Sequence, residues 1–197
     1  MAHLTSRTAY ADLVERLNRF PLGAPPSDLL TRILRLLLDE REAGLLSQVP
    51  IKPFGVSTAA RIWRVTPLEA RKTLDALADR AILLDVQRDG EPRYVLPPPM
   101  AGFFEFSLMR VRGDVDQAAL SALYYQYLNV EDDFVRELTR GTTQLGRAFV
   151  DETALPAREG LTVLDWERAS HVVRSAKAIG IGLCYCRHKM EHLGRAC

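Results

Sequence analysis

Three consecutive prolines, Pro97 to Pro99, restrict the folding of this chain more than any other feature. Proline fixes its own φ and lacks a backbone N–H, so a run of three ends a helix or a sheet ladder and favours a stiff, extended connection. The chain has 197 residues, which is enough for one or two domains. We therefore predict two domains, residues 1–99 and residues 100–197.

The first domain begins with amphipathic helices. Apolar residues at helical spacing predict one helix over 9–20 and a second that Ser27 caps and that runs to about Glu42. An extension of the second helix over 43–49 is also expected. These helices would supply much of the first domain's core.

Two more helices and a hairpin follow. Ser57 is the expected cap of a short helix over 58–63. A helix that begins after Thr66 and runs to about Arg80 is predicted next. Thr66 is its cap, a proline takes the first helical position, and a carboxylate follows three residues after the cap. Strands over 81–86 and 93–96 are expected to pair across an Asp-Gly turn. This order predicts a mainly α fold, a winged helix-turn-helix with a small β-hairpin, followed by a helical domain.

The second domain is expected to be helical and rich in buried aromatic residues. Helices are predicted over 103–111, 118–128 and 131–139, and the aromatic side chains of the first two are expected to pack in the core. Asp165 is the expected cap of a last long helix. The predicted buried side of that helix holds Trp166, Ala169, Val172, Val173, Ala176 and Ile179.

Positive charge and all the cysteines are concentrated at the end of the chain. Residues 168–197 contain six basic side chains and a single acid, Glu191, for a charge of about +5. The chain's three cysteines, Cys184, Cys186 and Cys197, fall in the same segment. A secreted disulfide framework would distribute its cysteines more evenly, so we expect reduced thiols with a chemical role.

The spacing of these residues is typical of a metal or cluster site. Thiolates bind zinc and iron–sulfur clusters, and neighbouring Arg and Lys residues offset the negative charge of such a centre. Cys184, Cys186, His188 and His192 could also form a tetrahedral zinc site. The alternatives are three incidental reduced thiols or a Cys-His nucleophile, which would need an orienting group.

Several segments of the chain resemble a family of bacterial ferredoxin-like proteins. They are Ile51-Lys-Pro-Phe54, the hairpin, the stretch from Tyr94 to Phe106, and Cys184-Tyr-Cys186-Arg-His-Lys-Met-Glu-His-Leu-Gly with Cys197. Members of that family join an N-terminal winged-helix-like region to a C-terminal [4Fe-4S] domain. The resemblance spans nearly the whole chain, and the cysteine segment is its most specific part.

The resemblance implies that Cys184, Cys186 and Cys197 are cluster ligands and that His188 and His192 lie next to the ligands or on the adjoining helix. Family members continue with further cysteines, whereas this chain supplies one thiolate too few for a four-cysteine cluster. The sequence is therefore expected to be truncated. The implied function is electron transfer to a redox partner protein, as a carrier or reductase subunit rather than a stand-alone enzyme.

A DNA-binding regulator, with the metal or cluster as its redox switch, is the second interpretation. The helix over 67–79 would enter the major groove. Its two basic residues, Arg71 and Lys72, are outnumbered by Glu69, Asp75 and Asp79, so it offers no basic stripe to phosphates.

The sequence also bears on location. No apolar stretch approaches the roughly 18 residues that a membrane-spanning helix needs. Residues 1–8 lack the apolar core of a signal peptide. A cytoplasmic protein without a membrane span is expected.

Overall fold

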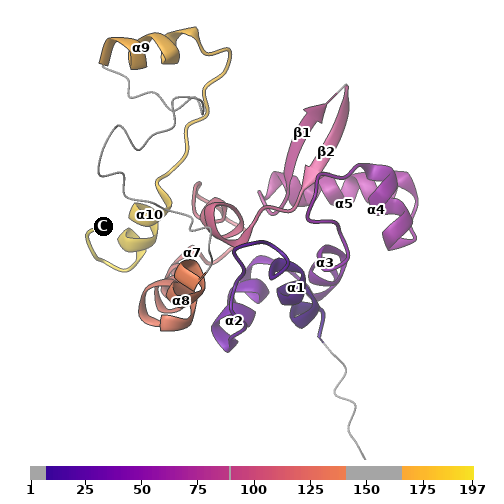
Figure 1. The fold of residues 1–197 in the computed structure, drawn as a ribbon, viewed down its shortest axis with the longest axis horizontal. Coiled ribbons are helices and arrows are strands. Elements are labelled where there is room, and N and C mark those ends of the chain that lie inside the picture. The colour runs from indigo at the N-terminus through magenta and orange to yellow at the C-terminus, as the bar shows by residue number, and fades with distance from the viewer. Residues whose placement is uncertain (1–7, 89, 141–165) are drawn as a thin grey trace, which may run out of the picture.

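A computed structural model of the chain describes residues 8–88, 90–140 and 166–197 (Figure 1). The described residues are mainly helical, with a two-stranded antiparallel sheet. This confirms the predicted mainly α fold with a small hairpin. The elements are α1 (Ala9–Leu17), α2 (Asp28–Leu37), α3 (Glu40–Leu46), α4 (Val56–Trp63), α5 (Pro67–Asp79), β1 (Leu84–Arg88), β2 (Glu91–Val95), the π-helical turn η1 (Pro99–Phe103), α6 (Phe104–Phe106), α7 (Gln117–Tyr125), the π-helical turn η2 (Gln126–Val130), α8 (Asp132–Arg140), α9 (Trp166–Ser175) and α10 (Tyr185–His192).

The second predicted helix is two helices, so the expectation of one helix to Glu42 and beyond was wrong. Ser27 caps α2 as predicted, through its hydroxyl and the N–H of Leu30. Asp39 then caps α3, and Glu42 returns a bond to the Asp39 backbone. This reciprocal pair stabilises a new helix start and turns the chain where the apolar pattern continues without interruption.

The cap of α4 also differs from its prediction. Gly55 is the N-cap, and no side chain bonds to the free N–H groups of that first turn. Ser57 lies inside the helix. The α5 prediction is confirmed, because Thr66 and Glu69 form a capping box around Pro67.

The hairpin pairs Leu84 with Val95 at one end and Arg88 with Glu91 at the other. Its strands lie a few residues from the predicted bounds. Gly90 lies in the turn with a φ of 80°, a conformation that glycine adopts without steric cost. Phe54 extends the pairing by exchanging two backbone hydrogen bonds with Tyr94, at 2.9 and 2.8 Å.

One hydrophobic core contains residues from both sides of the proline run. Trp63 is 9% exposed and donates its indole N–H to the carbonyl of Leu45 at 3.0 Å. The hydroxyl of Tyr127 donates to the carbonyl of Pro25 at 2.8 Å, and α2 packs against α7. These contacts hold α7, which supports the C-terminal segment, against α2 and the residues just before it.

Aromatic residues fill the part of the core beneath α7, as predicted. Phe104 is fully buried, and its ring contacts those of Phe103, Tyr124, Tyr127 and Phe134 at centroid distances of 5.4 to 6.2 Å. The predicted helix over 103–111 was wrong in form, because the described chain makes η1 and the short α6 and then turns. The proline run places the start of η1 at Pro99.

The predicted burial of the last long helix was wrong. The helix, α9, ends at Ser175 and has no buried residue. Trp166 is 77% exposed and Ile179 is 64% exposed. Figure 1 shows α9 standing apart from the other helices. Amphipathic spacing indicates a helix face that is able to pack against a neighbour, but no other described element packs against this face of α9. Asp165, the predicted cap, lies outside the described residues.

None of the helices in the described part of the chain is long and apolar enough to cross a membrane.

Candidate functional site

The cysteine segment is attached to α7 through α10. Tyr185 is 8% exposed, and its ring packs edge-on against Tyr124 with centroids 6.1 Å apart. Just before the helix, the N–H of Leu183 donates to the carbonyl of Met109 at 2.7 Å. Figure 1 shows α10 beside α7, against which it packs. The predicted site residues therefore lie on a segment that is fixed to the core, unlike α9.

Two of the cysteines lie at the start of α10. Cys184 is its N-cap and makes no side-chain capping bond, and Cys186 is the second helical residue. All three thiols are free and exposed. Their sulfur atoms are available for coordination, because neither disulfide pairing nor helix capping uses them.

A glycine turn folds the chain back after α10. Gly194 has a φ of 64°, and its N–H donates to the carbonyl of Glu191 at 2.9 Å. The N–H of Arg195 donates to the carbonyl of Met190 at 3.0 Å. These two bonds form a Schellman motif, in which the residue with positive φ reverses the chain direction. The turn directs Cys197 back towards the helix that carries Cys186.

A buried cation on α10 lies against η2. Lys189 is 5% exposed, and its ammonium donates to Asn129 Oδ1 at 2.7 Å. Burial lowers the pKa of Lys189, and the negative charges of Cys186, Cys197 and Glu105 act in the opposite direction. Lys189 has no ion pair with a carboxylate in the described part of the chain. Among the described residues, Asn129 is therefore the hydrogen-bond partner of this ammonium.

Aromatic rings surround the same cation. The Lys189 ammonium lies 5.2 Å from the ring centroid of Tyr185 and 6.0 Å from that of Tyr125. The Arg195 guanidinium lies 4.9 Å from the centroid of Tyr125. Ring faces attract cations, so these tyrosines hold positive charge beside the cysteines.

A hollow of about 460 Å³ opens next to Cys197. It is lined by Arg187, Glu191, Gly194, Arg195 and Cys197. Two guanidinium groups, one carboxylate and a thiol thus share one cavity, in which positive groups outnumber the acid.

The two histidines meet on one side of α10. His188 and His192 face each other with Nε2 atoms 3.1 Å apart, and Nδ1 of His188 is 2.8 Å from the carbonyl oxygen of Leu108. The structure brings neither the three predicted cluster cysteines nor the four predicted zinc ligands together around one point. Among the described residues there is no group of three or more His, Cys, Asp or Glu side chains placed to hold one metal ion.

Sequence reasoning missed two residues of this site, Lys189 as a buried group and Asn129. Lysine on a helix surface is ordinarily solvated, and the sequence gives no signal that Lys189 is buried. Asn129 is 60 positions away and is brought in by η2.

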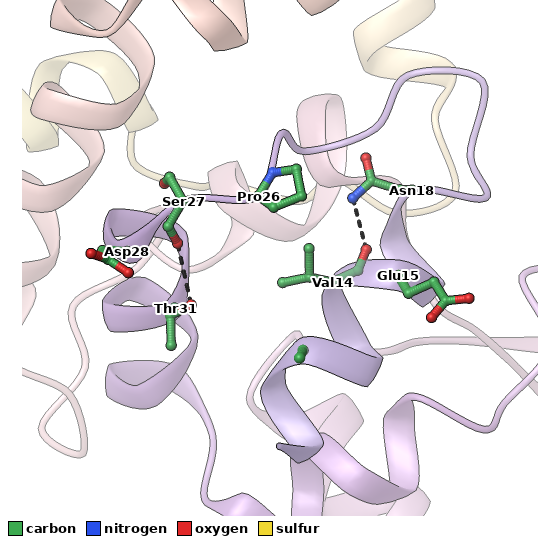
Figure 2. Close-up of a pocket in the computed structure, with 8 residues that line it drawn as sticks. Val14, Glu15, Asn18, Pro26, Ser27, Asp28 and Thr31 are labelled. Carbon is green, nitrogen blue, oxygen red and sulfur yellow. Dashed lines mark hydrogen bonds between the residues drawn. The ribbon is translucent and has the colours of Figure 1, made fainter. Parts of the chain in front are cut away.

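A second hollow, of about 610 Å³, lies between α1 and the start of α2. Figure 2 shows the residues that line it. Its wall includes Val14, Pro26 and Asn18, and the Asn18 side chain donates to the carbonyl of Val14 at 2.8 Å. The residues that line it include neither a thiol nor an imidazole. It therefore offers none of the ligand chemistry predicted for the C-terminal segment.

The predicted DNA-contacting helix, α5, uses part of its positive charge internally. Arg71 Nε donates to Asp75 Oδ2 at 2.7 Å, one turn along the helix. The Tyr94 hydroxyl donates to the other carboxylate oxygen of Asp75. This pairing leaves less positive charge for a phosphate backbone.

The Lys189 environment leads to a test of stability. Asn129→Ala removes the side-chain oxygen that, in the described part of the chain, accepts a hydrogen bond from the buried ammonium, so we expect it to cost about 1.5–3 kcal/mol. Lys189→Met removes the charge and keeps an apolar side chain of similar length, so it should cost less. Urea unfolding of the two variants measures the difference. A larger loss for Lys189→Met than for Asn129→Ala would contradict this account of the site.

No protein-family model, curated protein or solved structure matches this chain. The ferredoxin-like assignment remains a prediction from the resemblance.

Proposed function

We propose that this protein transfers electrons through a [4Fe-4S] cluster ligated by Cys184, Cys186 and Cys197. The first domain, proposed to be winged-helix-like, acts as the docking or regulatory module for a redox partner protein. When bound, the cluster supplies one-electron transfer at a potential set by its protein surroundings. The single observation that carries the proposal is the placement of three exposed, unpaired thiols on and just after α10, the helix that also carries the buried Lys189 ammonium.

The chemistry of the donor set fits this group. Three exposed thiols provide soft, anionic ligands, and a fourth ligand comes from outside this set. Lys189, Arg187 and Arg195 supply positive charge beside them, which offsets the negative charge of a thiolate-ligated cluster. Tyr185 and the core beneath it hold the segment in place, so these charges keep their positions during electron transfer.

The positive charges of Lys189, Arg187 and Arg195 would also affect the reduction potential of the cluster. A fixed positive charge stabilises the more negative, reduced form of a redox centre, so Lys189 would raise the potential. Asn129 acts as a positioning residue, because its side-chain oxygen orients the Lys189 ammonium.

Anaerobic reconstitution of this chain with ferrous iron and sulfide tests the proposal. We expect a brown protein that bleaches on reduction with dithionite. Cys184→Ser, Cys186→Ser and Cys197→Ser should each lose most of the bound iron and sulfide. A colourless product that retains zinc would reject the cluster.

A matched control tests whether iron binding depends on where the thiols lie or only on how many there are. Ser175 is exposed on α9 and makes only a local hydrogen bond to the carbonyl of Val172. The double variant Cys186→Ser/Ser175→Cys therefore restores three thiols without restoring the arrangement on α10. It should remain as poor in iron as Cys186→Ser. Recovery of the brown colour would show that the thiols act without a defined site.

A further inference from the structure

His188 and His192 form a close pair on α10 that the proposed cluster does not use. The residues are one helical turn apart, and their ring centroids are 4.7 Å apart with an interplanar angle of 38°. Their Nε2 atoms approach to 3.1 Å. Two ring nitrogens that face each other either share a single hydrogen or direct two lone pairs at one cation.

A backbone carbonyl determines which ring nitrogen of His188 carries the hydrogen. Nδ1 of His188 lies 2.8 Å from the carbonyl oxygen of Leu108. A carbonyl oxygen only accepts, so Nδ1 must carry the hydrogen. In the neutral imidazole, Nε2 of His188 is then the nitrogen with the lone pair, and it is the atom that faces His192. Metal-binding histidines are held in the same manner, by a backbone carbonyl or carboxylate on the nitrogen that does not bind the ion.

The spacing of the two nitrogens matches a shared ion. A zinc–nitrogen bond is about 2.0–2.1 Å, so two nitrogens on one ion lie about 2.9 Å apart at a right angle and about 3.4 Å apart at a tetrahedral angle. The observed 3.1 Å lies between these limits. The separation of the two nitrogens therefore meets the distance requirement of a shared ion.

We propose that His188 and His192 bind a divalent transition-metal ion through their Nε2 atoms, at a site separate from the three cysteines. Imidazole nitrogen suits Zn²⁺, Cu²⁺ and Ni²⁺ and is a poor ligand for Mg²⁺ or Ca²⁺. His192 is exposed, and the described residues gather no third ligand of the His, Cys, Asp or Glu type. Water fills the remaining positions of the ion, which leaves it open to an exogenous ligand.

Titration of the full chain with Co²⁺ tests this site, with the protein kept reduced. Co²⁺ takes the place of Zn²⁺ and reports its ligands, because thiolates give intense ligand-to-metal bands that imidazoles do not. To isolate the histidines, the variant Cys184→Ser/Cys186→Ser/Cys197→Ser is titrated beside the parent chain. All three cysteines are exposed, so these changes leave the core intact. We expect the triple variant to bind one Co²⁺ and to show no thiolate band.

Variants of the pair give the decisive comparison. His188→Asn places an amide N–H where Nδ1 lies, so it can keep the hydrogen bond to Leu108 while it removes Nε2. We expect His188→Asn and His192→Ala, each made in the triple variant, to weaken Co²⁺ binding at least tenfold. His171→Ala should bind as the triple variant does, because His171 is an exposed histidine on the separate helix α9. Circular dichroism of His188→Asn verifies that α10 remains helical.

Two results would overturn the site: no Co²⁺ binding by the triple variant, or unchanged affinity in both histidine variants. The first result would leave the pair as a simple N–H···N hydrogen bond. The test is independent of the proposed electron transfer, since the triple variant has no cluster ligands. Failure of iron–sulfur reconstitution therefore leaves this inference standing, and failure of this inference leaves the cluster proposal standing.

Discussion

Replacing Phe104 with alanine lowers the free energy of unfolding by about 3–5 kcal/mol, the range expected for a large aromatic residue lost from a packed core. Phe104 is fully buried and lies at the centre of the aromatic group formed with Phe103, Tyr124, Tyr127 and Phe134. Its removal leaves a cavity whose walls come from η1, α7, η2 and α8. These elements cannot all collapse into the space, because each is also held by its own backbone hydrogen bonds.

Urea unfolding measures this loss, and Leu68→Ala is the matched control. Leu68 lies on α5 and is 66% exposed, so its truncation should change the free energy of unfolding by about 0.5 kcal/mol or less. A loss below about 1 kcal/mol for Phe104→Ala would show that the aromatic group is loosely packed. The site would then lack a rigid support, because Tyr185 on α10 rests on Tyr124 of the same group.

Raising the pH above 10 should destabilise the protein steeply. Burial raises the pKa of Tyr124, Tyr127 and Tyr185 well above the ordinary value of 10.0. The folded state therefore keeps the protons of these three phenols at pH values where the unfolded chain releases them. The stabilisation is fully present below pH 10 and is lost as the pH rises towards the folded-state values. Each tyrosine contributes about 1.4 kcal/mol per pH unit, so the three together give about 4 kcal/mol per unit.

Tyr185→Phe isolates the tyrosine contribution from lysine and cysteine titration. It should reduce the fall in stability above pH 10 by about 1.4 kcal/mol per unit. Among the described residues, the Tyr185 hydroxyl is a buried group without a hydrogen-bond partner. Its removal should therefore cost little at neutral pH. Urea titrations at several pH values provide both numbers. Equal pH dependence in the variant and the parent would contradict the assigned burial of this phenol.

Local signals in the sequence predicted the elements that depend on neighbouring residues. The capping box at Thr66, the Asp-Gly hairpin and the helix over most of 118–128 were all visible as short patterns. The break between α2 and α3 was missed for a related reason: an unbroken apolar pattern concealed the competing cap at Asp39. A cap signal inside an apolar run can outweigh the periodicity around it.

The arrangement of the site depends on tertiary contacts, which short patterns do not contain. The sequence identified Cys184, Cys186 and Cys197 as candidates, and the four-residue spacing put His188 and His192 on one helix face. It gave no indication that Lys189 would be buried against Asn129. The apolar face of α9 illustrates the opposite error, because periodicity was interpreted as burial although no described element covers that helix.

The contrasting surroundings of the two tryptophans have a practical consequence for spectroscopy. The indole of Trp63 is enclosed beside α3, whereas that of Trp166 is open to water. Enclosed indoles emit at shorter wavelength and resist collisional quenchers, so the intrinsic fluorescence of this protein contains two separable signals. One follows the packing of α4 against α3 and the other follows the surroundings of α9, and a single emission spectrum records both without an added dye.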